Sequence, residues 1–123
     1  MEDLRSQQLE ALEAAAPYCE KISRAIGNLI EELSGNRQKD TDEYMTSIIN
    51  GLNWIVEVYN GTRDLVNQND KVIDKDAVND CVKALNEAKS ASDDAKMAEA
   101  FKGLRVFVED FREAALKLTS GMA

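Results

Sequence analysis

The chain contains no histidine. That absence removes the side chain most often used as a general base, as a transition-metal ligand and as a phosphate carrier. One proline and six glycines among 123 residues are few backbone breakers, which favours long helices over many short strands. No uncharged apolar run is long enough to span a bilayer, and the start MEDLRSQQ lacks the pattern of a secretion signal. We therefore expect a cytoplasmic protein.

The only two cysteines, Cys19 and Cys81, are far apart and belong to no CxxC pair. Both fall on apolar positions of helical repeats, so we expect reduced, packed thiols rather than a disulfide or a metal site. The formal net charge is −8, with Lys and Arg scattered along the chain. An acidic chain repels nucleic-acid phosphates and anionic lipid. We expect no nucleic-acid partner, no membrane partner and no cofactor.

Apolar residues make up 44% of the chain and charged residues 31%, which predicts one folded domain over residues 1–123. Four segments repeat apolar residues at spacings of three and four, over about 3–33, 40–66, 74–89 and 92–118. Short links between long amphipathic helices imply antiparallel neighbours. The predicted fold is all-α: an up-down-up-down four-helix bundle.

Several residues predict where these helices bend, begin or end. Pro17 lies inside the first segment, where its missing amide donor predicts a kink or a break. Gly35 suits a helix C-terminal cap. Asp40 and Glu43 have the spacing of a capping box for the second helix, and Ser92 can cap the fourth.

The stretch NGLNWIVEVYNG, residues 50–61, is ambiguous between strand and helix. Apolar residues alternate around Trp54 as in a half-buried strand, and Asn-Gly pairs suit hairpin turns. The three-four repeat continues on both sides, and no second strand pattern exists to pair with it, so the helix is favoured. Gly51 and Gly61 then lie inside a helix, where each costs up to about 1 kcal/mol relative to Ala. Something should compensate for each of them.

Trp54 falls outside the main apolar stripe of this helix. At about 100° per residue it joins a second stripe, roughly 130° away, in which small residues surround one large aromatic. The stripe consists of Ser47, Gly51, Trp54, Val58, Gly61 and Leu65. Two readings stay open: the stripe packs inside a central helix of the bundle, or it forms an interface with a partner or a second copy. The second reading predicts a non-enzymatic interaction module, either a homodimer or an adaptor or chaperone-like bundle.

The alternative is a magnesium-dependent hydrolase of the all-helical type. Glu10 and Glu13 have the ExxE spacing, and Glu31 and Glu32 could add carboxylates, since Mg²⁺ needs few protein ligands. The sequence holds no matching ExxD, and solvated charge on a helix face is the simpler interpretation. No catalytic, cofactor-binding or metal-ligating residue is assigned.

The run GLNWIVEVYNGTRDL follows a helix containing CEKISRAI and precedes a short helix and a longer one. It resembles small uncharacterised all-helical proteins of Gram-positive bacteria that carry a Gly-Leu-x-Trp run on the second helix. The resemblance covers most of the chain and implies a helical fold, with no assigned activity and no site residues. The chain is also similar in type to flagellar and secretion export chaperones, which are small, acidic and helical.

Overall fold

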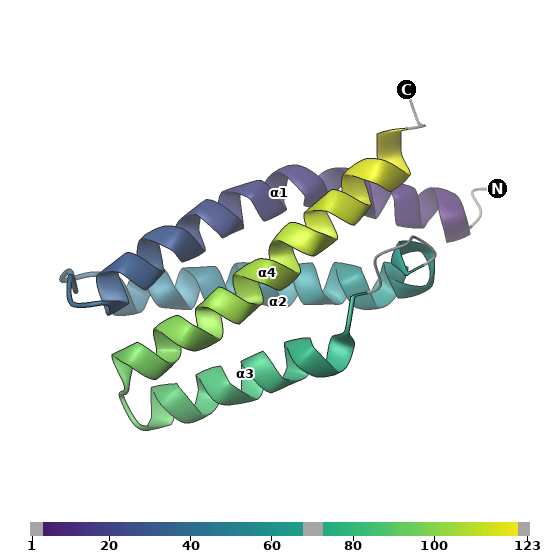
Figure 1. Cartoon of the computed structure of the whole chain (residues 1–123). Coiled ribbons are helices and arrows are strands. Elements are labelled where there is room, and N and C mark those ends of the chain that lie inside the picture. Colours follow the sequence, from purple (N-terminus) through teal and green to yellow (C-terminus); the bar gives the residue numbers. More distant parts are fainter. Residues whose placement is uncertain (1–3, 68–72, 121–123) are drawn as a thin grey trace.

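The computed structural model describes residues 4–67 and 73–120 of the chain. It contains four helices, α1 (Leu4–Leu33), α2 (Thr41–Val66), α3 (Lys75–Ser90) and α4 (Asp94–Thr119), and no strand within these residues. Successive helices run in opposite directions (Figure 1). The expected all-α four-helix bundle is confirmed. None of the described helices has the length and apolar character needed to cross a membrane.

Helix α4 holds the bundle together. Helix α4 crosses the molecule diagonally and packs against α1. It also packs against α3 (Figure 1). Helix α2 packs mainly on α1, and within the described residues the backbone of α3 lies close to α4 alone. Both α2 and α3 are therefore left with sides that no other helix covers.

The apolar stripes expected from the sequence form one continuous core. Tyr59 on α2 meets Phe107 and Phe111 of α4 edge-on, with ring centroids 5.5 Å and 5.8 Å apart. Each large side chain buried in this way contributes about 1.5–3 kcal/mol relative to an exposed position. Val82 of α3 remains 38% exposed, because within the described residues the backbone of α3 has α4 as its only helical neighbour.

One polar cluster joins α1 to α4 inside this apolar contact. Ser23 is buried on α1, and its hydroxyl donates a hydrogen bond to the Glu109 carboxylate on α4. The Ser23 oxygen in turn accepts a hydrogen bond of 3.1 Å from Arg105 Nε. The Arg105 guanidinium lies over Gly27, where a Cβ would meet Nη1 at 2.9 Å. Serine and glycine at these two positions let a charged side chain of α4 lie against α1.

Helix α1 runs without interruption from Leu4 to Leu33, with Pro17 inside it. The predicted break is wrong, and the kink stays a prediction. Pro17 itself is exposed, while Ala16 and Cys19 beside it are buried. Core packing on both sides of the proline holds the helix together where the backbone alone loses a hydrogen bond. At the far end, Gly35 takes the expected left-handed conformation, with φ of 111°.

The start of α2 does not use the predicted capping box. Asp40 is the N-cap residue, but its side chain makes no capping hydrogen bond. The buried Thr41 binds the loop before the helix: its hydroxyl accepts a hydrogen bond of 2.7 Å from the Gln38 amide and donates one of 2.7 Å to the Glu32 carboxylate of α1. Thr41 therefore fixes the loop between α1 and α2, and no side chain of the described residues caps the start of α2.

The predicted cap of α4 is displaced by one residue. Ser92 has a φ of 53°, a left-handed conformation that belongs to the turn and not to the helix start. Asp93 is the N-cap, and its carboxylate accepts a hydrogen bond of 3.1 Å from the Lys96 amide. Ser92 therefore belongs to the turn after α3, and Asp93 caps α4 instead.

The buried phenol of Tyr59 links Asn67, at the end of α2, to Ile73, just before α3. Its hydroxyl donates to the Ile73 carbonyl at 3.1 Å and accepts from Asn67 Nδ2 at 3.3 Å. Asn67 Oδ1 also accepts a hydrogen bond of 3.1 Å from the Ile73 amide. These bonds satisfy both backbone groups of Ile73, which is itself buried.

Replacing Tyr59 with phenylalanine should lower the free energy of unfolding by about 1–2 kcal/mol, because the buried Ile73 carbonyl loses its donor. Urea unfolding followed by circular dichroism measures the change. Tyr44→Phe is the matched control, since the half-buried Tyr44 hydroxyl bonds the Ala25 carbonyl at 3.3 Å and solvent can replace it. Equal losses in the two variants would contradict the proposed role of Tyr59.

Arg37, in the loop between α1 and α2, binds the first turns of α2 and α4 at one end of the bundle. It donates to both carboxylate oxygens of Asp94, at 2.8 Å and 3.1 Å, and to Asp42 at 2.8 Å. The hydrogen bonds from Arg37, and then its charge, hold the pKa of Asp94 below the ordinary value. A carboxylate with a lowered pKa adds stability above its unfolded pKa of about 3.9, and this stability is lost as the pH falls through the folded value.

Asp94→Asn should therefore lower the stability at pH 7 by less than about 1 kcal/mol, since the pair is partly exposed to solvent. The difference from the wild type should hold down to about pH 5 and shrink as the pH falls below about 4. Thermal unfolding of both proteins at a series of pH values measures it. A difference that stays constant toward about pH 3 would contradict the role of this ion pair.

Candidate interaction surface

The second stripe of α2 divides into an inner and an outer part. Gly51 and Leu65 are buried. A Cβ at Gly51 would lie 2.6 Å from Ile22 Cδ1 and 2.6 Å from the Tyr18 hydroxyl, both on α1. Glycine at this position lets α1 approach α2 closely. The close packing of α1 on α2 is the compensation expected for the stability that Gly51 costs inside a helix.

Trp54 belongs to the outer part. Its indole packs edge-on against the Tyr18 ring of α1, with ring centroids 5.1 Å apart. The side chain nevertheless remains 39% exposed, beside the half-buried Val58. The tryptophan is thus fixed from one side by α1 and open on the other.

Gly61 lies seven residues after Trp54 on the same side of the helix. It is exposed, and a Cβ built on it would have no atom within 4 Å. Its carbonyl accepts a hydrogen bond of 3.1 Å from Gln8 Nε2, a contact that any residue could make. No packing within the described residues therefore compensates for a glycine that costs up to about 1 kcal/mol relative to alanine.

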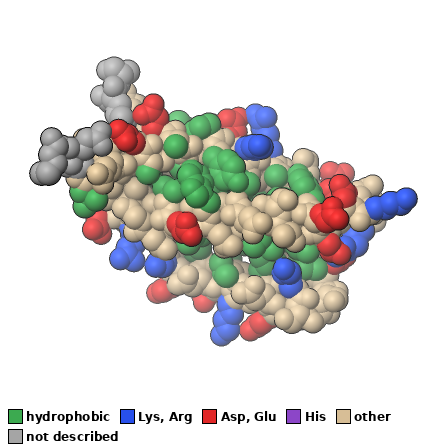
Figure 2. All heavy atoms as spheres, turned by 180° about the vertical axis from the view of Figure 1, so that it is seen from behind, with side chains coloured by type: hydrophobic (Ala, Val, Ile, Leu, Met, Phe, Trp, Pro, Cys, Tyr) green, Lys and Arg blue, Asp and Glu red, His purple; other side chains and the backbone are tan. Residues whose placement is uncertain are grey.

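We call the outer face of α2 the surface formed by Ser47, Trp54, Val58 and Gly61. Figure 2 views the molecule from the side on which α2 lies and shows hydrophobic side chains gathered near the middle of that side. Tryptophan is among the residues that contribute most to protein interfaces. The outer face combines a rigid aromatic with an open glycine, which suits close contact with another helix.

The carboxylates of the alternative hypothesis do not come together. Glu13 and Glu31 are separated by 18 residues of one continuous helix, or about 27 Å along its axis. Glu32 is engaged by the Thr41 hydroxyl. The described residues contain no group of three Asp, Glu or Cys side chains placed to hold a metal ion. Glu10 and Glu13 at one end and Glu31 and Glu32 at the other cannot share one ion.

Both cysteines are free thiols on helices. Burial raises the pKa of Cys19 to about 12. Burial, and then the neighbouring charge of Asp80, raises the pKa of Cys81. Because the thiolate is the reactive form, neither cysteine is activated as a nucleophile at neutral pH.

A family model described as a domain of unknown function, DUF8042, matches residues 10–118. The chain belongs to the DUF8042 family. No curated protein and no solved structure matches the chain significantly. The DUF8042 match spans all four helices, so the outer face of α2 lies within the family domain.

Alanine at the two glycines of the second stripe should change stability in opposite directions. Gly51→Ala forces Ile22 and Tyr18 to move, and overpacking of about 1–3 kcal/mol should exceed the helix-propensity gain, so the free energy of unfolding falls. Gly61→Ala should raise it by about 0.5–1 kcal/mol, because the new methyl group meets nothing. Urea unfolding at low protein concentration measures both. A loss of stability in Gly61→Ala would show that this glycine is needed by the monomer.

Proposed function

We propose that this protein is a non-enzymatic interaction module that binds a helix through the outer face of α2, and that the helix belongs to a second copy of the chain. The observation that carries this proposal is Gly61, a helix-interior glycine without a packing partner beside a half-exposed tryptophan. A partner helix would occupy the open space at Gly61 and cover Trp54. That contact would offset the stability that glycine costs the monomer.

The spacing of the outer face is self-complementary. Val58 lies four residues after Trp54 and three residues before Gly61. When two copies of α2 cross antiparallel about a two-fold axis near Val58, Trp54 of each copy reaches Gly61 of the other. A large side chain then meets the position without one, twice, as an isologous interface requires. Tyr18 supports the indole from behind and limits the conformational entropy lost on binding.

A pair of variants tests this contact directly. Trp54→Ala removes the large side chain, and Gly61→Leu fills the open position, so each variant alone should weaken self-association by roughly tenfold or more. Mixed together, the two chains should associate again, because the introduced leucine of one faces the introduced alanine of the other and the second contact is native. Light scattering on a sizing column across a dilution series measures the mass of each sample.

Further controls distinguish loss of the Trp54–Gly61 contact from a general loss of self-association or folding. Asn53→Leu, on the exposed polar side of α2, should leave the mass unchanged. Circular dichroism should show that all variants keep their helicity. A wild-type dimer that the mixture fails to restore would rule out the reciprocal Trp54–Gly61 contact. A wild-type monomer at about 100 μM would rule out self-association as the role of this face.

Within this proposal the protein acts as an adaptor or chaperone-like bundle in the cytoplasm. Two free thiols are compatible with a reducing compartment. The net charge of −8 favours basic protein partners over nucleic acid or anionic membranes. We also propose that the chain is related to the Gram-positive proteins that carry a Gly-Leu-x-Trp run. In this chain that run contains Trp54, the aromatic residue of the outer face of α2.

A further inference from the structure

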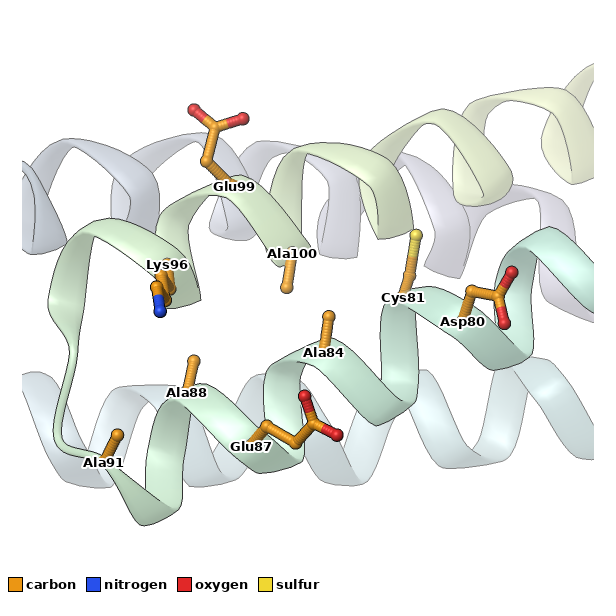
Figure 3. Close-up of a pocket in the computed structure, with 9 residues that line it drawn as sticks. All are labelled: Asp80, Cys81, Ala84, Glu87, Ala88, Ala91, Lys96, Glu99 and Ala100. Atoms are coloured by element: carbon orange, nitrogen blue, oxygen red, sulfur yellow. The ribbon is translucent and has the colours of Figure 1, made fainter.

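A second open surface lies between α3 and α4, away from Trp54. It is a groove with a volume of about 440 Å³. Figure 3 shows Ala84 and Ala88 of α3 and Ala100 of α4 pointing into the space between the two helices. The residues that line it are Asp80, Cys81, Ala84, Glu87, Ala88, Ala91, Lys96, Glu99 and Ala100.

The floor of the groove is apolar and regularly spaced. Along α3 and its C-cap residue, spacings of three or four residues separate Cys81, Ala84, Ala88 and Ala91. At one end a Cβ on Gly103 would lie only 2.5 Å from the Cys81 sulfur, so the two helices are in close contact there. Beyond that contact the alanines are too short to fill the space between the helices. Side chains of a third helix could fill it in the manner of knobs entering holes.

The rim of the groove is acidic. Asp80 and Glu87 stand two helical turns apart on α3, about 10 Å along its axis. Within the described part of the chain, neither carboxylate forms an ion pair. Glu99 on the α4 side is paired with Lys102 at 3.1 Å, and Lys96 is the one cation of the lining. The rim therefore presents two carboxylates without an ion-pair partner, at a defined spacing, against one lysine.

We propose that the groove between α3 and α4 binds an amphipathic helix of a partner protein, with large apolar residues at three-four spacing and two Lys or Arg residues seven positions apart on its flank. The apolar residues would fill the alanine floor, and the basic pair would meet Asp80 and Glu87. This inference goes beyond the proposed function, because it concerns a different surface and a different occupant. It does not require that the chain form a dimer.

The test uses a labelled helical peptide without tryptophan, with leucines at three-four spacing and lysines seven residues apart. Fluorescence anisotropy with the full chain measures binding. A control peptide carries glutamate in place of both lysines. The basic peptide should bind with a dissociation constant below roughly 100 μM, and the acidic peptide roughly tenfold more weakly or not at all. Added salt should weaken binding of the basic peptide.

Matched variants locate the binding site. Ala84→Arg places bulk and positive charge on the exposed floor and should weaken binding by roughly tenfold or more. Asn86→Arg adds the same charge on the same helix, outside the lining residues, and should have a much smaller effect. The double reversal Asp80→Lys with Glu87→Lys should transfer the preference to the acidic peptide. Circular dichroism should confirm that each variant stays helical.

Three results would overturn the inference. They are no binding of the basic peptide, equal binding of both peptides, or equal losses in Ala84→Arg and Asn86→Arg. Emission from Trp54, the only tryptophan of the chain, reports separately on the outer face of α2. It should stay unchanged when the groove is occupied. A shift that saturates with the peptide would place binding on α2 instead and reject the groove.

Discussion

The packing of α4 against α1 is the contact on which the rest of the structure depends. It buries Phe101 and Phe111 of α4 completely, along with Leu12 and Ile26 of α1. The Ser23, Glu109 and Arg105 cluster fixes the register of the two helices at one point, because a buried hydroxyl between two charged groups tolerates little sliding. Helices α2 and α3 are then held mainly by one member of the pair each.

This arrangement explains why the molecule has two open surfaces of different character. Helix α2 packs on α1 through its main stripe and through Gly51, which leaves Trp54 and Gly61 outside. Among the described residues, the backbone of α3 lies close to α4 alone and the helix buries Val78, Leu85 and Ala88, which leaves alanines such as Ala84 exposed beside α4. The first surface offers one rigid aromatic and an open position beside it. The second offers a shallow apolar floor with an acidic rim.

In the part of the chain that the structure describes, neither surface brings together carboxylates placed to hold a metal ion or a thiol activated as a nucleophile. The carboxylates considered as a metal site lie at opposite ends of α1, and the pKa of each thiol is raised, which disfavours the reactive thiolate. What both surfaces offer is shape and charge for another helix. The proposed association through helices rests on these features, which lie within the family domain.

The sequence by itself determined the helices and most of the core. Each of the buried residues Ile26, Ile55 and Phe101 belongs to a series of apolar residues on its own helix, spaced by three or four positions. That spacing places the members of a series on one side of the helix. The tertiary structure alone decided what happens within the second stripe. Gly51 and Gly61 are both glycines on the same stripe of α2. The path of α1 buries Gly51 and leaves Gly61 open. Tertiary packing also decided the loop contact of Thr41, the cap at Asp93, the continuity of α1 through Pro17 and the groove beside α3, which local patterns do not encode.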